Sequence, residues 1–224
     1  MGAFSMQGKI SAVLFDMDGL LLDTERIVLD CFRQTCAGFG LSGMDQVFYQ
    51  CLGLRRADSR RVLERELGHL LDLSQFQIAW ETRIVSRLAH YVPVKPGAVM
   101  LLQQLKTLGI PTVVATSTTT EVAVENLKTA GLYALVSTVL GGEQVEHGKP
   151  DPEIYCKAAA LVGHDPHNCA AFEDSDAGTL AAVRSGALTV QVDLRAPLPQ
   201  TVALGHLVAK DLYAGALRIG LIAG

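Results

Sequence analysis

The fold is decided by one stretch near the start of the chain, Val13-Leu14-Phe15-Asp16-Met17-Asp18-Gly19-Leu20-Leu21-Leu22-Asp23-Thr24-Glu25. The run from Ile10 to Phe15 is short, largely apolar and contains β-branched residues, which predicts a strand buried on both faces. The run ends at two carboxylates, Asp16 and Asp18, followed by Gly19. The stretch therefore predicts a buried strand that carries two acids at its carboxyl end.

The two acids are separated by a single residue. If the chain stays extended through Met17, the side chains of Asp16 and Asp18 leave on the same side. Two carboxylates at such a short distance repel each other unless they share a proton or bind a divalent cation. Oxygen ligands favour Mg²⁺, and this ion leaves room for a phosphate. Gly19 allows the sharp turn that follows. The other interpretation is an Asp-rich turn that closes a strand, because Asp and Gly are common in turns.

Composition limits the class of protein. The chain has 224 residues, 49% of them hydrophobic, which is enough for one domain of usual size and a smaller one. A net charge of -4 gives no reason to expect a nucleic-acid partner, and no apolar run approaches the roughly 20 residues that a membrane span needs. Residues 1–9 lack the apolar middle of a secretion signal, and we expect a loose terminus there.

The cysteines indicate a reducing compartment. None of the five belongs to a CxxC pair, and their odd number and irregular spacing do not form a disulfide framework. They are Cys31, Cys36, Cys51, Cys156 and Cys169. We expect a cytoplasmic protein with reduced thiols.

Residues 24–91 show a helical period and no clear strand. The first expected helix follows residue 24 and is ended by Gly38 and Gly40, and the others span about residues 44–51, 57–67 and 74–88. Ser74 is the expected N-cap of the last of these helices. Two prolines between Tyr91 and Gly97 mark the return to the main domain. We therefore predict an all-α domain over residues 24–91, inserted into a main domain formed by residues 1–23 and 92–224.

The rest of the chain alternates between helical and strand patterns. Helical patterns cover residues 98–108, 120–130, 152–162 and 176–185, and strand-like apolar runs cover residues 112–115, 134–140, 169–172 and 188–192. A further strand over residues 203–209 and a helix over residues 211–217 complete the pattern. Such alternation predicts an α/β fold with a doubly wound parallel sheet and helices on both faces.

Polar residues follow these apolar runs too. Thr116 opens the run Thr116-Ser117-Thr118-Thr119-Thr120, whose hydroxyls and amides suit an anion or, alternatively, a plain helix N-cap. Glu173 and Asp174 follow a strand and could equally mark the first turn of a helix. Lys149 lies in a loop restricted by Gly148 and Pro150, where its ammonium can be aimed, although a surface turn would read the same. Open α/β sheets bind ligands at the carboxyl ends of their strands, so we expect these residues at one edge.

The string Asp16-Met17-Asp18-Gly19, followed by Asp23-Thr24-Glu25, resembles motif one of the haloacid dehalogenase superfamily. The similarity is to its branch of β-phosphoglucomutase-like and phosphoglycolate phosphatase-like proteins, which insert a helical C1 cap directly after that motif. Thr116, the string Gly148-Lys149-Pro150-Asp151-Pro152 and the string Glu173-Asp174-Ser175-Asp176-Ala177-Gly178 are similar to motifs two, three and four. The resemblance implies a Rossmann-like core with an inserted all-α helical cap domain.

The resemblance also implies roles for the residues of the four motifs. Asp16 would be the nucleophile that forms an aspartyl phosphate, and Asp18 the general acid and base. Thr116 and Lys149 would complete the catalytic set by holding the phosphoryl charge. The implied cofactor is Mg²⁺, with Asp16, Asp18 through its backbone carbonyl, Asp174 and Glu173 as the metal site.

Substrate contacts are expected from Gly19, from Ser117 and Thr118, and from the cap. The cap string Cys51-Leu52-Gly53-Leu54-Arg55-Arg56-Ala57-Asp58-Ser59 resembles the family segment in which a glycine precedes an arginine that reaches a phosphate or sugar. By that match Arg56 is the first candidate and Arg55 the second. The alternative is a solvated helix face, since this part of the chain holds several arginines beside acids.

The function that the resemblance implies is Mg²⁺-dependent hydrolysis of a small phosphorylated metabolite such as a sugar phosphate. The alternative is a sugar phosphomutase, but family mutases carry a histidine where this chain has Val28, and a cap lysine, whereas this chain has no lysine between Lys9 and Lys95. The missing lysine also disfavours a phosphonate hydrolase, and Asp18 disfavours a dehalogenase. A binding protein that has lost turnover is a third hypothesis. We expect neither a nucleic-acid nor a membrane partner, and a monomer by default with a dimer left open.

Overall fold

The computed structural model describes residues 10–192 and 203–223, so the expected loose terminus at residues 1–9 lies outside the described residues. Within these ranges, six parallel strands form one sheet in the order β3-β2-β1-β4-β5-β6. They are β1 (Ala12–Phe15), β2 (Thr112–Ala115), β3 (Thr138–Leu140), β4 (Cys169–Glu173), β5 (Leu188–Val192) and β6 (Leu207–Ala209). The strand that carries the first two acids is central, with β2 and β4 on either side.

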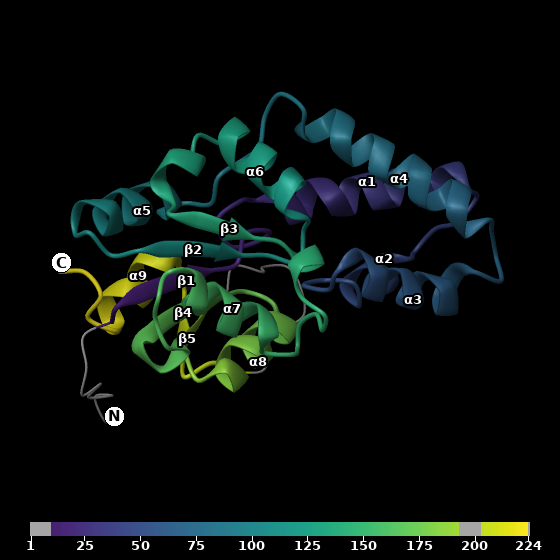
Figure 1. Ribbon diagram of the computed structural model, residues 1–224. Coiled ribbons are helices and arrows are strands. Elements are labelled where there is room, and N and C mark those ends of the chain that lie inside the picture. The colour runs from purple at the N-terminus through teal and green to yellow at the C-terminus, as the bar shows by residue number, and fades with distance from the viewer. Residues whose placement is uncertain (1–9, 193–202, 224) are drawn as a thin grey trace.

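Helices cover both faces of the sheet (Figure 1). One face packs against α5 (Ala98–Thr107), α6 (Thr120–Thr129) and α9 (Leu212–Arg218), and the other against α7 (Glu153–Leu161) and α8 (Asp176–Ser185). Val13 and Phe15 point to the first core, and Ala12 and Leu14 to the second, as the two-residue period of a strand requires. The predicted α/β fold with a doubly wound parallel sheet is confirmed.

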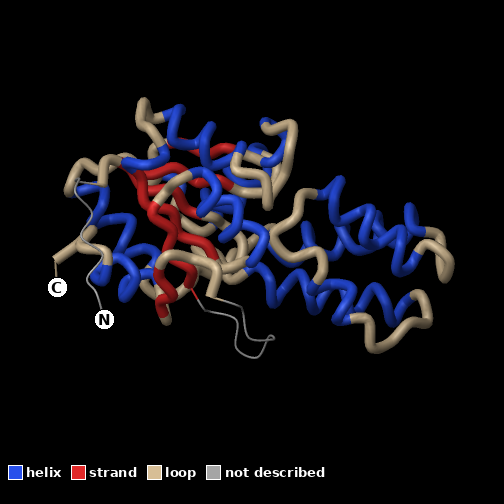
Figure 2. The backbone as a smooth tube through the Cα atoms, turned by 90° about the horizontal axis from the view of Figure 1, so that it is seen from below, coloured by secondary structure: helices blue, strands red, loops and turns tan. Residues whose placement is uncertain are grey.

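The segment between β1 and α5 is helical. All of its residues are described, and they form α1 (Thr24–Gly38), α2 (Asp45–Tyr49), α3 (Arg56–Leu67) and α4 (Leu73–Leu88). These helices extend away from the strands (Figure 2). They pack around their own aromatic cluster, in which the Phe32 ring lies 5.7 Å from the rings of Phe48 and Phe76 and 5.1 Å from that of Trp80. A separate hydrophobic cluster supports the prediction of an inserted domain, whose boundaries at residues 24 and 91 stay a prediction.

The two ends of this insertion meet at one point. The backbone N–H of Asp23 donates to Pro93 O at 2.8 Å, and that of Lys95 donates to Leu21 O at 2.9 Å. The Lys95 ammonium also pairs with Asp23 Oδ1 at 2.8 Å. The outgoing and returning chains are therefore paired side by side, next to the end of β1.

Two local expectations were wrong. Ser74 is not the N-cap of α4, because Asp72 occupies that position and its side chain accepts from the backbone N–H groups of Ser74 and Gln75. Asp is an equally good cap, and the helix begins one residue before Ser74. The apolar run at residues 134–140 is not a continuous strand, since Tyr133–Leu135 forms a 3₁₀ turn and only Thr138–Leu140 pairs in the sheet.

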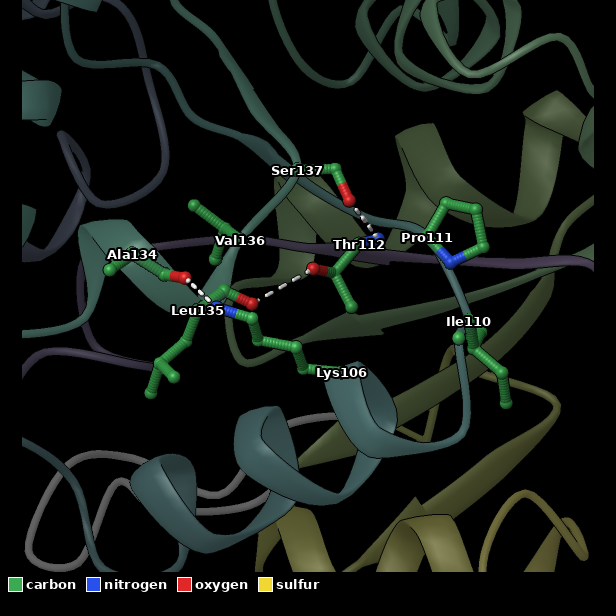
Figure 3. A pocket seen from close by; sticks show the side chains of 9 residues that line it. Lys106, Ile110, Pro111, Thr112, Ala134, Leu135, Val136 and Ser137 are labelled. Atoms are coloured by element: carbon green, nitrogen blue, oxygen red, sulfur yellow. Dashed lines mark hydrogen bonds between the residues drawn. The ribbon is translucent and has the colours of Figure 1, made fainter.

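A surface hollow of about 370 Å³ lies at the amino ends of β2 and β3. Figure 3 shows Lys106 reaching across it to the carbonyl of Ala134, and Ser137 bonded to the backbone N–H of Thr112. Its polar groups are thus engaged with each other. The hollow lies at the sheet edge opposite the carboxyl ends where the sequence places the acids.

The burial of the thiols gives a first prediction. All five cysteines lie in described residues and are free, and only Cys156 is exposed. Burial raises the pKa of Cys36, Cys51 and Cys169 to about 11. Ellman's reagent at pH 8 is therefore expected to label Cys156 alone in the native protein and all five thiols in denaturant. Native Cys156→Ser protein should be unreactive, and rapid labelling of a second thiol would contradict this burial.

Candidate active site at the carboxyl edge of the sheet

Acids from two neighbouring strands meet at the carboxyl edge. Asp16 follows β1, while Glu173 ends β4 and Asp174 follows it, and β1 and β4 are adjacent in the sheet. Each of the three offers a carboxylate oxygen, and these oxygens lie within 4.8 Å of one another. All three residues are buried, with exposed fractions of 6% or less. The structure therefore brings these three predicted metal ligands together.

Lys149 lies between two of these acids. Its Nζ is 2.5 Å from Asp16 Oδ1 and 2.6 Å from Glu173 Oε1, and it also donates to Ala115 O at 3.2 Å. Burial lowers the pKa of the ammonium, but the charges of Asp16 and Glu173 outweigh this and hold it well above the ordinary range of a lysine. The ammonium is therefore charged and is shared between the ends of β1 and β4.

Asp16 itself lies in a poor environment for a charge. Burial raises the pKa of its carboxyl well above the usual range, and the Lys149 charge offsets only part of this effect. An additional positive charge next to Asp16 would favour its ionised, nucleophilic form.

Glu173 is held from several sides. Its Oε1 accepts from Lys149 and from the Tyr155 hydroxyl, the latter at 3.1 Å, and its Oε2 accepts from the backbone N–H groups of Asp174 and Ser175 and from the Ser175 hydroxyl. Ser175 in turn caps α8 through the N–H of Gly178. Burial raises the pKa of Tyr155 well above its usual range, so its hydroxyl stays protonated and donates. Glu173 thus joins the start of α8 to Lys149.

Asp18 lies among hydroxyl groups. Its Oδ1 accepts from Thr24 at 2.7 Å, and its Oδ2 accepts from Thr118 at 2.8 Å and from Thr116 at 3.5 Å. These contacts bring together motif one and the loop after β2, as the sequence predicts. The side chain of Asp18 is not part of the three-acid group, and its expected catalytic and metal-binding roles stay predictions.

The donor set fits Mg²⁺. Three buried carboxylates lie close together, two of them bonded to the ammonium of Lys149, and carboxylate oxygens are ligands that this ion prefers. Gly19, with a φ of +90°, keeps space open beside them, because a Cβ there would collide with Asp174 Oδ2 and with the Glu25 carboxylate. The residues present therefore fit a divalent cation.

The predicted substrate residues are only partly gathered here. Gly19 and Thr118 lie beside the acids, and the Ser117 hydroxyl donates to Gly53 O of the helical insertion at 2.8 Å. Arg56 is not brought to the acids: its side chain is 76% exposed and its guanidinium pairs with Glu81 of α4 at 2.7 Å. The first turn of α3 directs Arg56 outward and leaves its neighbour Arg55 facing the main domain.

Sequence reasoning missed Tyr155, Thr24 and Ser175 as parts of the site. Thr24 and Ser175 stand inside the quoted motif strings, so their position was a usable signal. Tyr155 is six residues beyond Lys149 on α7, and nothing in the periodicity of that helix separates it from a core residue.

Comparisons with known proteins agree with this geometry. A family model described as haloacid dehalogenase-like hydrolase matches residues 10–186. A phosphorylated carbohydrates phosphatase from Thermotoga maritima is 29% identical over 177 residues, covering 79% of this chain and 82% of that protein. Hexitol phosphatase A from Escherichia coli is 31% identical over 199 residues, covering 86% and 87%. The solved β-phosphoglucomutase from Clostridium difficile shares the fold, with a TM-score of 0.75 at 22% identity over 90% of this chain and 91% of that one.

The class that follows is that of the phosphatases, hydrolases that act on phosphoric monoester bonds. The chain belongs to the haloacid dehalogenase-like hydrolase family. The family resemblance of its four motifs is thereby confirmed.

Gly178 gives a prediction about the support of Glu173. A Cβ at this third residue of α8 would collide with the Glu173 carboxylate. Gly178→Ala is therefore expected to lower the free energy of unfolding in urea by about 1–3 kcal/mol, as overpacking does. An ordinary helical Gly→Ala change raises it by about 0.5–1 kcal/mol.

Gly38→Ala in α1 is the matched control, because a Cβ there meets nothing within 4 Å. It should leave stability unchanged or slightly raised. Equal effects of the two substitutions would show that the space at Gly178 is not reserved for Glu173.

Proposed function

We propose that the protein is a Mg²⁺-dependent phosphatase that hydrolyses a small phosphorylated metabolite, such as a sugar phosphate, through an aspartyl-phosphate intermediate. The observation that carries this proposal is the buried Lys149 ammonium between Asp16 and Glu173, with Asp174 alongside. Acids gathered beside one ammonium at a strand end are a setting in which a divalent cation and a phosphoryl group could be held together.

In the proposed reaction Asp16 attacks phosphorus and forms a phosphorus–oxygen bond while the bond to the leaving alkoxide breaks. Asp18 gives its proton to that alkoxide. Water then attacks the phosphorus of the aspartyl phosphate, Asp18 takes up the proton, and Asp16 is released with inorganic phosphate. The contacts of Asp18 with Thr24 and Thr118 are suited to hold its carboxyl in place between the two steps.

The phosphoryl charge is assigned to Thr116, Lys149 and the backbone N–H of Ser117. Each such donor is worth on the order of 100-fold in rate. Mg²⁺ would be held by Asp16, Asp174, the backbone carbonyl of Asp18 and Glu173, directly or through water, and when bound it would neutralise and orient the phosphoryl oxygens.

The substrate class is proposed from the relatives and from the insertion. The two relatives are named as a phosphatase of phosphorylated carbohydrates and as a hexitol phosphatase. We assign residues 24–91 as a cap that closes over the substrate and excludes bulk water, with Gly19, Ser117 and Thr118 at its boundary with the core. The identity of the substrate is set by the cap, the part of the chain that the family motifs cover least.

A sugar phosphomutase is the second candidate, since the fold is shared with a β-phosphoglucomutase. Val28, at the position where family mutases carry histidine, packs against the aromatic cluster of the insertion, and its carbonyl accepts from the Trp80 indole. The apolar side chain at this position supports hydrolysis over the mutase reaction.

None of the described helices is long and apolar enough to cross a membrane, and the cytoplasmic location and the monomeric state stay predictions.

Asp16 provides the central test of phosphatase activity. With p-nitrophenyl phosphate and Mg²⁺, Asp16→Asn is expected to lower kcat by at least about 1,000-fold, because an amide is no nucleophile. EDTA should abolish turnover, and added Mg²⁺ should restore it. Asp45→Asn, which changes a half-buried carboxylate of α2 that pairs with Arg33, is the control and should leave kcat unchanged. Full activity of Asp16→Asn, or no activity of well-folded wild-type protein with Mg²⁺, would contradict the proposal.

Product analysis separates the two candidate functions. Incubation of the enzyme with a hexose 1-phosphate and Mg²⁺ is expected to release inorganic phosphate and free hexose, because the histidine and cap lysine of the mutases are absent. ³¹P NMR distinguishes the outcomes. Accumulation of the 6-phosphate isomer without free phosphate would establish the mutase.

A further inference from the structure

The turn that leads into α3 is the part of the insertion that touches the main domain near the site. The Gly53 carbonyl accepts from the Ser117 hydroxyl in the loop after β2. A Cβ at Gly53 would lie 2.9 Å from the Ser175 Cβ in the turn after β4. The same turn therefore lies against two of the loops that hold the site.

Arg55 contacts a third loop, the one that carries Lys149. Its Nη1 donates to the carbonyls of Val145 and Glu146, both at 3.1 Å, while its Nε donates to Asp58 Oδ2 at 2.9 Å. The side chain is only 21% exposed. The planar guanidinium thus joins one carboxylate of the insertion to two backbone carbonyls of the main domain, a geometry that the fork of an arginine allows.

The loop is shaped to receive this side chain. A Cβ at Gly148, the residue before Lys149, would lie 2.8 Å from Arg55 Cδ, and one at Gly142 would lie 3.1 Å from Arg55 Cγ. Two glycines therefore leave the space that Arg55 fills.

The loop is also held from its other side. The Glu153 carboxylate at the start of α7 accepts from the backbone N–H groups of Glu146 at 3.0 Å and His147 at 2.8 Å. The main domain thus fixes the N–H groups of Glu146 and His147, while the insertion fixes the carbonyls of Val145 and Glu146. Removal of Arg55 would leave these two carbonyls without their bonds to the insertion.

We propose that Arg55 is a positioning residue whose fork ties the helical insertion to the Lys149 loop, so that docking of the insertion and placement of the Lys149 ammonium occur together. Arg55 acts through Lys149 and touches no substrate in this role. The kinetic consequence rests on the proposed phosphatase function, whereas the docking of the insertion does not.

The test compares Arg55→Gln, Arg55→Lys and Gly148→Ala with the control Arg61→Gln. Arg61 lies on the same helix, is 79% exposed and pairs with the other oxygen of Asp58, so this control removes the same charge without touching the main domain. Each protein is measured by small-angle X-ray scattering and by kcat and KM for p-nitrophenyl phosphate. Circular dichroism checks that each variant is folded.

Arg55→Gln is expected to increase the radius of gyration and to lower kcat by about 10- to 100-fold, the factor that corresponds to lost hydrogen bonds from a charged group. KM should change less, because Arg55 in this role touches the loop of Lys149 and not the substrate. Arg55→Lys keeps the positive charge and should recover part of kcat. The recovery should be incomplete, because an ammonium is a point charge that cannot span both carbonyls and Asp58. Gly148→Ala should resemble Arg55→Gln, and Arg61→Gln should match the wild type.

The proposal would be overturned if both Arg55→Gln and Gly148→Ala had the same radius of gyration as the wild type. An unchanged kcat with a raised KM for p-nitrophenyl phosphate would also overturn it, because that result would make Arg55 a substrate ligand. If wild-type protein shows no phosphatase activity, the proposed function fails, but the scattering comparison still decides the role of Arg55.

Discussion

The carboxyl edge of the sheet depends on one buried ammonium. Lys149 is bonded to acids at the ends of two adjacent strands, and an ion removed from water costs several kcal/mol unless its partners are well placed. The structure supplies those partners. Glu173 is fixed by Tyr155, by Ser175 and by the backbone N–H of Asp174, and Gly178 leaves room for its carboxylate. The local structure of the turn after β4 and the site chemistry therefore follow from the same requirement.

Much of the fold and the main acids of the site could be predicted from the sequence. Apolar runs of strand length ended at Asp16, Thr116 and Glu173, and parallel strands place such ends at one edge. From this physical rule, residues far apart in the chain could be predicted to lie close together without any knowledge of side-chain positions. The helical insertion could also be predicted, because the spacing of apolar residues there is helical and differs from that of the flanking strands.

The remaining site details depend on tertiary packing, which one-dimensional patterns do not contain. Arg55 and Arg56 are adjacent and chemically identical, and only the direction of the first turn of α3 decides that one meets the main domain and the other meets Glu81. The hydroxyl of Tyr155 on α7 belongs to the site only because it donates to Glu173 at the end of β4. Asp72 and Ser74 compete as caps, and a one-residue shift in the helix start decided between them.

The paired ends of the insertion also matter over longer times. The chain leaves the main domain at Asp23 and returns at Pro93 and Lys95 through the same short pairing, so the residues between these points form an insertion whose two ends lie side by side. Evolution can lengthen, trim or exchange such an insertion while the order of the strands stays intact. A helical segment grafted from a relative would need to match this narrow base and also the contacts that Gly53 and Arg55 make with the loops of the main domain.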